Sequence, residues 1–312
     1  MPSSITHYLF ALDALSDSSI QKDVFFLGAQ GPDTFFYYGY HPFIKKNKKI
    51  ISSFGTKLHD INLAKAYSFM VKYADENPLH KNMILSYVKG LFCHYVLDRA
   101  THPYIFYVTL FDNFQNNGKE YGRMHAYFET FVDVLYRQKY SYAGSTFQMI
   151  KCQKEDLLVL SRMFSALTKE MFPNYPLEDD SFYKAYKSFA FGLKTLYSKN
   201  GVKKSFFDSF MKKSLGNAMS HPKRVPDDII KLDILNEQHR SWKNPVTGEK
   251  SSLSFEELTR IAERDFKEVV SSIGNSDFNE FLEKFVRNTD HRGCPVDGEL
   301  NYHRYIFKNI VL

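Results

Sequence analysis

Histidine and aspartate recur every four residues in one apolar segment, Val88 to Pro103, which reads VKGLFCHYVLDRATHP. At about 100° per residue, His94, Asp98 and His102 fall on neighbouring parts of one helix face. That face continues through the apolar Leu91, so the three polar side chains should point into the core. Buried imidazoles and carboxylates are costly without a partner, and zinc takes both as ligands. The segment predicts a metal-ligating helix that ends at Pro103.

A second helix, predicted over Tyr121 to Lys139, carries His125 and Glu129 four residues apart on its apolar face. His-x-x-x-Glu on a buried face is a second two-ligand set. Asp133 lies one turn further along the same helix. We leave two interpretations of it open: a residue that fixes a histidine tautomer, or an exposed helix residue.

Two more candidate ligands come earlier in the chain. His7 lies on the inner face of a helix predicted over Ile5 to Leu15. Asp33 follows Gly31 and Pro32, a tight turn that can hold a carboxylate at a fixed point.

His59 is predicted on a helix that begins after Gly55. It shares one helical stripe with the apolar residues Leu63, Ala66 and Met70, which places its imidazole on a core face as well. With the residues above, it gives the first 140 residues an unusual concentration of metal-type ligands.

The elements that must position these residues are helical. The 312 residues, net charge +6 and 44% hydrophobic content suit one all-α domain over 1–312, with ligand motifs in 1–140 and a helical remainder in 150–312. No apolar run reaches about 18 residues and no signal peptide is visible, so we expect a cytoplasmic protein without a transmembrane segment. Three well-separated cysteines argue against a disulfide framework, and Cys93 is expected to be a packed core thiol.

Further helices are predicted in the remainder, and a long loop in one part of it. The helices are Glu155 to Phe172, Asp180 to Ser198, Ser205 to Gly216, Ser254 to Ile273 and Asp277 to Arg287. The loop is His221 to Gly248, which contains the single tryptophan, Trp242. No segment has convincing strand periodicity. Most of the other histidines are assigned to the surface or to loops: His41, His80, His221, His239, His291 and His303.

The chain resembles the zinc-dependent phospholipase C family, which is related in fold and metal centre to the single-strand-specific zinc nucleases. The resemblance rests on five short motifs in about the first 140 residues. They are Ile5-Thr6-His7, Gly31-Pro32-Asp33, Leu58-His59, HYVLDRATHP from His94 to Pro103, and HAYFE from His125 to Glu129. It implies an all-α multi-helix bundle of the phospholipase C and nuclease type.

The resemblance also implies two zinc ions, or three with a further site. One would be held by His59, His94 and Asp98, with Asp33 as a further ligand or as the base for the attacking water. A second would be held by His102, His125 and Glu129. The third uses His7, Asp98 and a free amino terminus, which after removal of Met1 would be the secondary amine of Pro2. Thr34 and Thr56 stand where the family has choline-binding aromatics, so the head group is left open.

The favoured prediction is a zinc-dependent phosphodiester hydrolase that acts on a phospholipid or similar head group, with peripheral membrane contact. Zinc supplies an activated water, and Asp33 is the candidate catalytic residue that orients or deprotonates it. A nuclease or phosphomonoesterase on the same scaffold is an alternative, so nucleic acid is not excluded as a substrate. The neighbouring His59 and Asp60 suggest an HD phosphohydrolase, which leaves His125 and Glu129 unexplained. A non-catalytic helical module with structural zinc is the remaining alternative.

Overall fold

The structure, a computed structural model, describes residues 4–15, 18–109, 118–196 and 230–296. Its helices are α1 (Ser4–Ala14), α2 (Lys22–Gly28), η1 (Gly31–Tyr37), α3 (Lys48–His59), α4 (Ala64–Asp75), α5 (Lys81–Thr109), α6 (Gly118–Lys139), η2 (Gln148–Ile150), α7 (Lys154–Met171), α8 (Ser181–Leu196), α12 (Phe255–Ser272) and α13 (Phe278–Val286). Strands β1 (Trp242–Lys243) and β2 (Lys250–Ser251) form a small antiparallel hairpin. The predicted all-α fold is confirmed.

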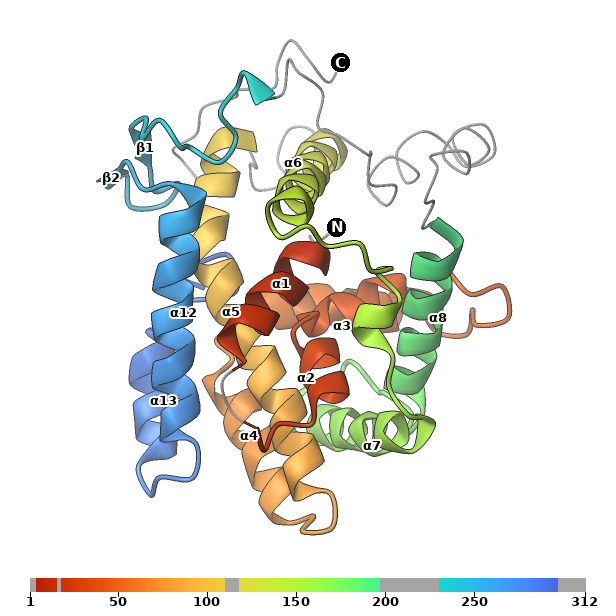
Figure 1. Cartoon of the computed structure of the whole chain (residues 1–312). Coiled ribbons are helices and arrows are strands. Elements are labelled where there is room, and N and C mark those ends of the chain that lie inside the picture. The colour runs from red at the N-terminus through yellow and green to blue at the C-terminus, as the bar shows by residue number, and fades with distance from the viewer. Residues whose placement is uncertain (1–3, 16–17, 110–117, 197–229, 297–312) are drawn as a thin grey trace.

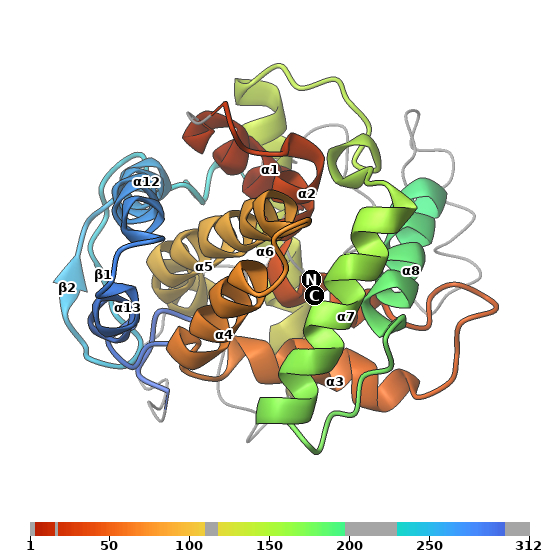
Figure 2. The ribbon, with the colours of Figure 1, turned by 90° about the horizontal axis from the view of Figure 1, so that it is seen from below.

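Helix α5, 29 residues long, runs through the middle of the molecule. Figures 1 and 2 show α12 and α13 on one side of it and α3, α7 and α8 on the other. Helix α2 crosses α5 backbone against backbone, since a Cβ on Gly90 would lie only 2.2 Å from the carbonyl oxygen of Phe25. This close crossing brings the chain after α2 against the face of α5 that carries the candidate ligands.

Aromatic packing anchors η1 in the core. Phe35 is fully buried and meets Phe54 of α3 and Phe164 of α7 edge-on, each at 5.2 Å between ring centroids. Edge-to-face pairs of buried aromatic rings contribute about 0.5–1.5 kcal/mol each beyond the area that they bury. Because Asp33 lies two residues before Phe35, these contacts also fix the position of its carboxylate.

The predicted end of the central helix at Pro103 is wrong, because α5 continues to Thr109. A proline inside a helix removes the N–H that would bond the carbonyl four residues earlier, here that of Arg99. Gly293 packs directly on this carbonyl: a Cβ there would lie 2.1 Å from Arg99 O and 2.9 Å from Pro103 Cγ. A distant segment therefore covers the interrupted turn, and the buried apolar face beyond it keeps the helix going.

The single helix predicted to carry His59 and Met70 is also wrong. His59 is the last residue of α3, and α4 begins at Ala64 after a four-residue break. The side chain of Asn62 accepts a hydrogen bond from Ala64 N at 2.9 Å, a local turn that competes with helix. The apolar stripe is buried, with Ala66 and Met70 on α4 and Leu63 just before its first residue.

The helices predicted for the second half are confirmed where the structure describes them, as α7, α8, α12 and α13. The predicted helix Ser205 to Gly216 and the first part of the predicted loop, 221–229, lie outside the described residues. The described part of that loop, 230–248, contains the short strand β1, which the sequence did not predict. Trp242 is buried and donates from its indole N–H to Leu253 O at 3.1 Å.

The expectations for the cysteines are met. The three cysteines are free, and Cys93 is fully buried. Within the described ranges, no helix combines the length and apolar character needed to cross a membrane.

Candidate metal centre

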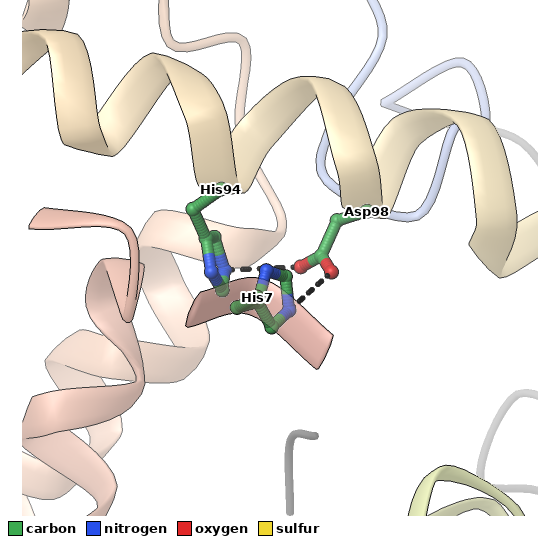
Figure 3. A group of neighbouring side chains, drawn as sticks. All are labelled: His7, His94 and Asp98. Atoms are coloured by element: carbon green, nitrogen blue, oxygen red, sulfur yellow. Dashed lines mark ion pairs between the residues drawn. The ribbon is translucent and has the colours of Figure 1, made fainter. Parts of the chain in front are cut away.

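The polar face of α5 is buried as predicted. Asp98 lies between two imidazoles: its Oδ2 is 3.0 Å from Nε2 of His94, and its Oδ1 is 3.1 Å from Nε2 of His7 on α1. Figure 3 shows His94 and Asp98 leaving α5 on the side that faces His7. The rings of His7 and His94 stack with centroids 4.2 Å apart. These three residues form one compact group of ligand-type atoms.

Asp133 holds α1, and with it His7, against α6. Its fully buried carboxylate accepts hydrogen bonds from Ile5 N at 3.1 Å, Thr6 N at 2.8 Å and Thr6 Oγ1 at 2.7 Å. A carboxylate at a helix N-terminus satisfies N–H groups that have no partner within the helix. Of the two interpretations made from the sequence, the exposed helix residue is wrong, because Asp133 is fully buried. That Asp133 fixes a histidine tautomer stays a prediction.

A second group consists of Asp33, His59 and His94. His59 Nε2 lies 3.2 Å from Asp33 Oδ1. Gly31 makes room for the His94 ring beside this pair. Its φ is +58°, and a Cβ at this position would lie 2.2 Å from Cδ2 of His94. Only glycine adopts this conformation easily and leaves room for the ring. The turn therefore aims the carboxylate as the sequence predicted, and it does so by packing on His94.

The third group consists of His102 from α5 and of His125 and Glu129 from α6. Glu129 Oε1 lies 3.0 Å from Nε2 of His125 and 3.5 Å from Nε2 of His102. The ring of Phe106 stacks on His102 at 5.0 Å and lies tilted against His125 at 5.3 Å. An apolar ring against one face of the group keeps water from that side.

All eight residues predicted as ligands lie in these three groups, and within each group the ligand atoms are within 4.8 Å of one another. His94 belongs to two groups, and Asp98 Oδ2 is 3.8 Å from His102 Nδ1, so the groups adjoin. The arrangement differs in detail from the ligand sets implied by the resemblance. Asp33 groups with His59 and His94, whereas Asp98 groups with His7 and His94. The amino terminus implied for the third site lies outside the described residues.

The donor chemistry of the groups fits zinc. The Nδ1 atoms of three histidines face backbone carbonyls: His59 faces Gly55 O at 2.7 Å, His94 faces Ala29 O at 3.2 Å, and His102 faces His291 O at 2.9 Å. This second contact fixes the tautomer and leaves Nε2 with a lone pair for a metal. Two buried carboxylate oxygens inside the groups have no hydrogen-bond partner: Asp33 Oδ2 and Glu129 Oε2. Such atoms are costly unless something binds them.

The electrostatics favour the ligand forms of two acids and two imidazoles. Burial opposes the ionisation of Asp98, but His94, His102 and His7 outweigh it and hold its pKa well below the usual range. Burial similarly opposes ionisation of Glu129, and His125 and His102 lower its pKa. Burial lowers the pKa of His94 and of His125. Zinc binds ionised carboxylates and neutral imidazoles, so these residues are ready to bind it near neutral pH.

His291 is a buried histidine beside these groups that the sequence did not identify, because it was assigned to the surface or to loops. It is fully buried, and its ring lies 4.8 Å from that of His59 and 5.3 Å from that of His94. It lies beyond α13, in a segment without helical periodicity, so no spacing rule could connect it to the other ligands. Only its residue type was a signal.

Comparisons with known proteins agree with this picture. A family model, zinc dependent phospholipase C, matches residues 1–176. No curated protein and no solved structure matches the chain. The matched range runs from before α1 to beyond α7 and includes all eight predicted ligands, while His291 lies outside it.

Proposed function

Because the chain belongs to the zinc-dependent phospholipase C family, we propose that it is a zinc-dependent phosphodiester hydrolase that acts on phospholipids. The observation that carries the proposal is the set of three adjoining groups of ligand atoms, joined through His94 and Asp98. His59 and His125 keep 15% and 14% of their side chains exposed, so the centre is reachable from solvent. A purely structural zinc site is usually closed.

The eight residues of the three groups would hold the zinc ions. When bound, zinc supplies a water of lowered pKa and positive charge for the phosphate. Asp33 is the proposed catalytic residue. Its Oδ1 faces His59, while its buried Oδ2 has no hydrogen-bond partner and can orient the attacking water and accept its proton. His59 in turn holds Asp33 in place, because its Nδ1 is fixed by Gly55 O.

Asp33→Asn tests this role. We expect zinc-loaded protein to hydrolyse phosphodiesters and the variant to lose about 10²–10⁴-fold in kcat, because the amide accepts no proton. Asp60→Asn is the matched control, since Asp60 adjoins His59 but is 47% exposed and lies 3.9 Å from Arg292. An Asp33→Asn protein with unchanged fold, zinc content and activity would instead favour a non-catalytic module with structural zinc.

The control also tests the HD phosphohydrolase alternative. In that alternative His59 and Asp60 act as a pair on one metal, so Asp60→Asn would abolish activity. The structure favours the other pairing, because His59 Nε2 faces Asp33 and the Asp60 side chain is half exposed. We therefore expect Asp60→Asn to keep wild-type activity.

The substrate class follows from a panel assayed at equal zinc content: phospholipid vesicles, bis(p-nitrophenyl) phosphate, p-nitrophenyl phosphate and single-stranded DNA. Release of a phosphorylated head group from vesicles supports the phospholipid proposal. Cleavage of DNA without cleavage of vesicles would favour the nuclease alternative, and hydrolysis of the monoester alone would favour a phosphomonoesterase.

A surface feature supports contact with a membrane. In the segment 41–50, Phe43 is 90% exposed and Ile50 is 40% exposed. Four exposed lysines accompany them: Lys45, Lys46, Lys48 and Lys49. Exposed apolar side chains among cations fit an anionic lipid surface.

Co-sedimentation with vesicles of phosphatidylglycerol tests this contact. Burying a phenylalanine is worth about 1.5–3 kcal/mol, so Phe43→Ser should weaken binding by about 10-fold or more. Leu79→Ser is the matched control, because Leu79 is 93% exposed in a turn next to Asp75 and Glu76, away from the lysine cluster. Equal binding of the two variants and the wild type would refute the contact.

A further inference from the structure

The segment Asn288 to Val296 forms a closed loop after α13. Val296 N donates to Asn288 O at 3.0 Å, and Asp290 N donates to Cys294 O at 3.1 Å. The buried carboxylate of Asp290 pairs with Arg292 within the loop. The loop is therefore rigidly tied to itself, and what it presents outward is set by its own backbone.

This loop sits on the candidate metal centre. The hydroxyl of Tyr95 on α5 lies 3.0 Å from Oγ1 of Thr289. Gly293 covers the carbonyl of Arg99 on the same helix. The backbone of His291 then joins two of the groups. Its N–H donates to His59 O at 3.3 Å, and its carbonyl accepts from His102 Nδ1 at 2.9 Å.

The imidazole of His291 lies fully buried among these groups. Neither of its ring nitrogens has a hydrogen-bond partner. Tyr95 offers only a ring edge, at 5.2 Å between centroids. A buried polar atom without a partner costs about 1–3 kcal/mol, so a ligand that takes the lone pair of this imidazole would recover part of that cost. Two imidazole rings lie close to it, those of His59 and His94, both members of the second group.

The ring separations fit three histidines around one ion. With Zn–N bonds of about 2.0–2.1 Å and a tetrahedral arrangement, ring centroids of two histidines are roughly 5 Å apart. The observed separations are 4.8 Å for His59 and His291, 5.3 Å for His94 and His291, and 5.8 Å for His59 and His94. The nitrogens of His291 are not among the ligand atoms already within 4.8 Å of one another in the described residues, so the imidazoles must close slightly around the ion.

We propose that His291 is a further zinc ligand beside His59 and His94, so that the segment after α13 supplies the third histidine around one ion and leaves the carboxylate of Asp33 next to it for the attacking water. The proposal rests on the zinc-binding part of the proposed function. It goes beyond the family match, because His291 lies outside residues 1–176. It also gives the loop a purpose: its backbone orients His59 and His102, and its side chain binds the ion.

The test is zinc affinity of His291→Phe, measured by competition with a chromophoric chelator, together with the absorption spectrum after cobalt replaces zinc. Phenylalanine keeps a ring against Tyr95 and His59 but has no nitrogen. We expect one zinc to bind at least about 10-fold more weakly and the cobalt spectrum to change, because a ligand nitrogen is lost. Unchanged affinity for every zinc and an unchanged spectrum would overturn the proposal.

Two further variants separate the side chain from the loop. Gly293→Ala should displace the loop from Arg99 O and so weaken zinc binding at His102 as well, whereas His291→Phe should spare that group. His80→Ala, at an exposed position before α5, should leave zinc binding unchanged.

A crystal structure of the zinc-loaded wild-type protein decides the matter if His291→Phe does not fold. A His291 nitrogen at about 2.0–2.1 Å from zinc supports the proposal, and one beyond bonding distance overturns it. These readouts do not depend on catalysis. Zinc binding through His291 without hydrolysis of any phosphodiester would refute the proposed function alone, while hydrolysis with unchanged zinc affinity in His291→Phe would refute this proposal alone.

Discussion

Replacing Gly31 by alanine should damage the metal centre through one methyl group. The new Cβ would lie 2.2 Å from Cδ2 of His94, whereas carbon atoms pack at about 3.5 Å or more. The ring or the turn must therefore move by about 1.3 Å. Such a shift threatens the contact of 3.2 Å between His94 Nδ1 and Ala29 O, which fixes the imidazole. It also separates Asp33 from His94.

The expected loss has two parts, one in folding free energy and one in zinc affinity. Alanine at a φ of +58° costs about 1–2 kcal/mol of folding free energy from backbone strain alone. Displacement of His94 affects two groups of ligands at once, and loss of an orienting contact typically weakens metal affinity by about 10–100-fold. We therefore expect weaker zinc binding in both groups that contain His94, and little change at Glu129.

Gly274→Ala is the control for strain. Gly274 has a φ of +95°, and a Cβ there would meet nothing within 4 Å. It should lose stability in urea unfolding but keep zinc affinity, whereas Gly31→Ala should lose both. A folded Gly31→Ala protein with wild-type zinc affinity, measured by chelator competition, would refute the reasoning that the turn and His94 are packed as one unit.

Three other predictions follow from the site. Asp133→Ala should cost about 3–5 kcal/mol in urea unfolding, because buried donors of α1, including both of those on Thr6, lose a charged acceptor; a loss below about 1 kcal/mol would contradict this. Elemental analysis should find more zinc lost in His94→Ala than in Glu129→Ala, since His94 belongs to two groups; equal loss would argue against shared ligands. In the metal-free protein, burial opposes protonation of His102, but Asp98 and Glu129 raise its pKa to about 9. Its contribution to stability is therefore fully present below pH about 6.5 and is lost as the pH rises towards about 9, so His102→Ala should flatten the pH dependence of unfolding there; an unchanged slope would refute it.

The errors in the sequence reasoning have a common origin. Proline ends most helices, but in α5 the loop at Gly293 covers the exposed carbonyl of Arg99. Helical spacing predicted one helix from His59 to Met70, yet a turn at Asn62 interrupts the helix between them. In both cases a pattern read over a few turns was correct about burial. It was wrong about continuity, because a contact outside the pattern decided it.

The sequence by itself determined the ligands that are linked by helix geometry. His94, Asp98 and His102 share a face of α5, and His125 and Glu129 share a face of α6, because a period of 3.6 residues acts within a few turns. The helical fold class followed from the same periodicity.

Only the tertiary structure decided how these faces meet and what completes them. Asp33 joins His59 through the packing of Gly31 on His94, and Asp133 holds α1 from more than 120 residues away in the sequence. His291 reaches the centre from a loop that no periodicity describes. The physical reason is that contacts between distant segments depend on which surfaces pack together, and a local pattern carries no information about that choice.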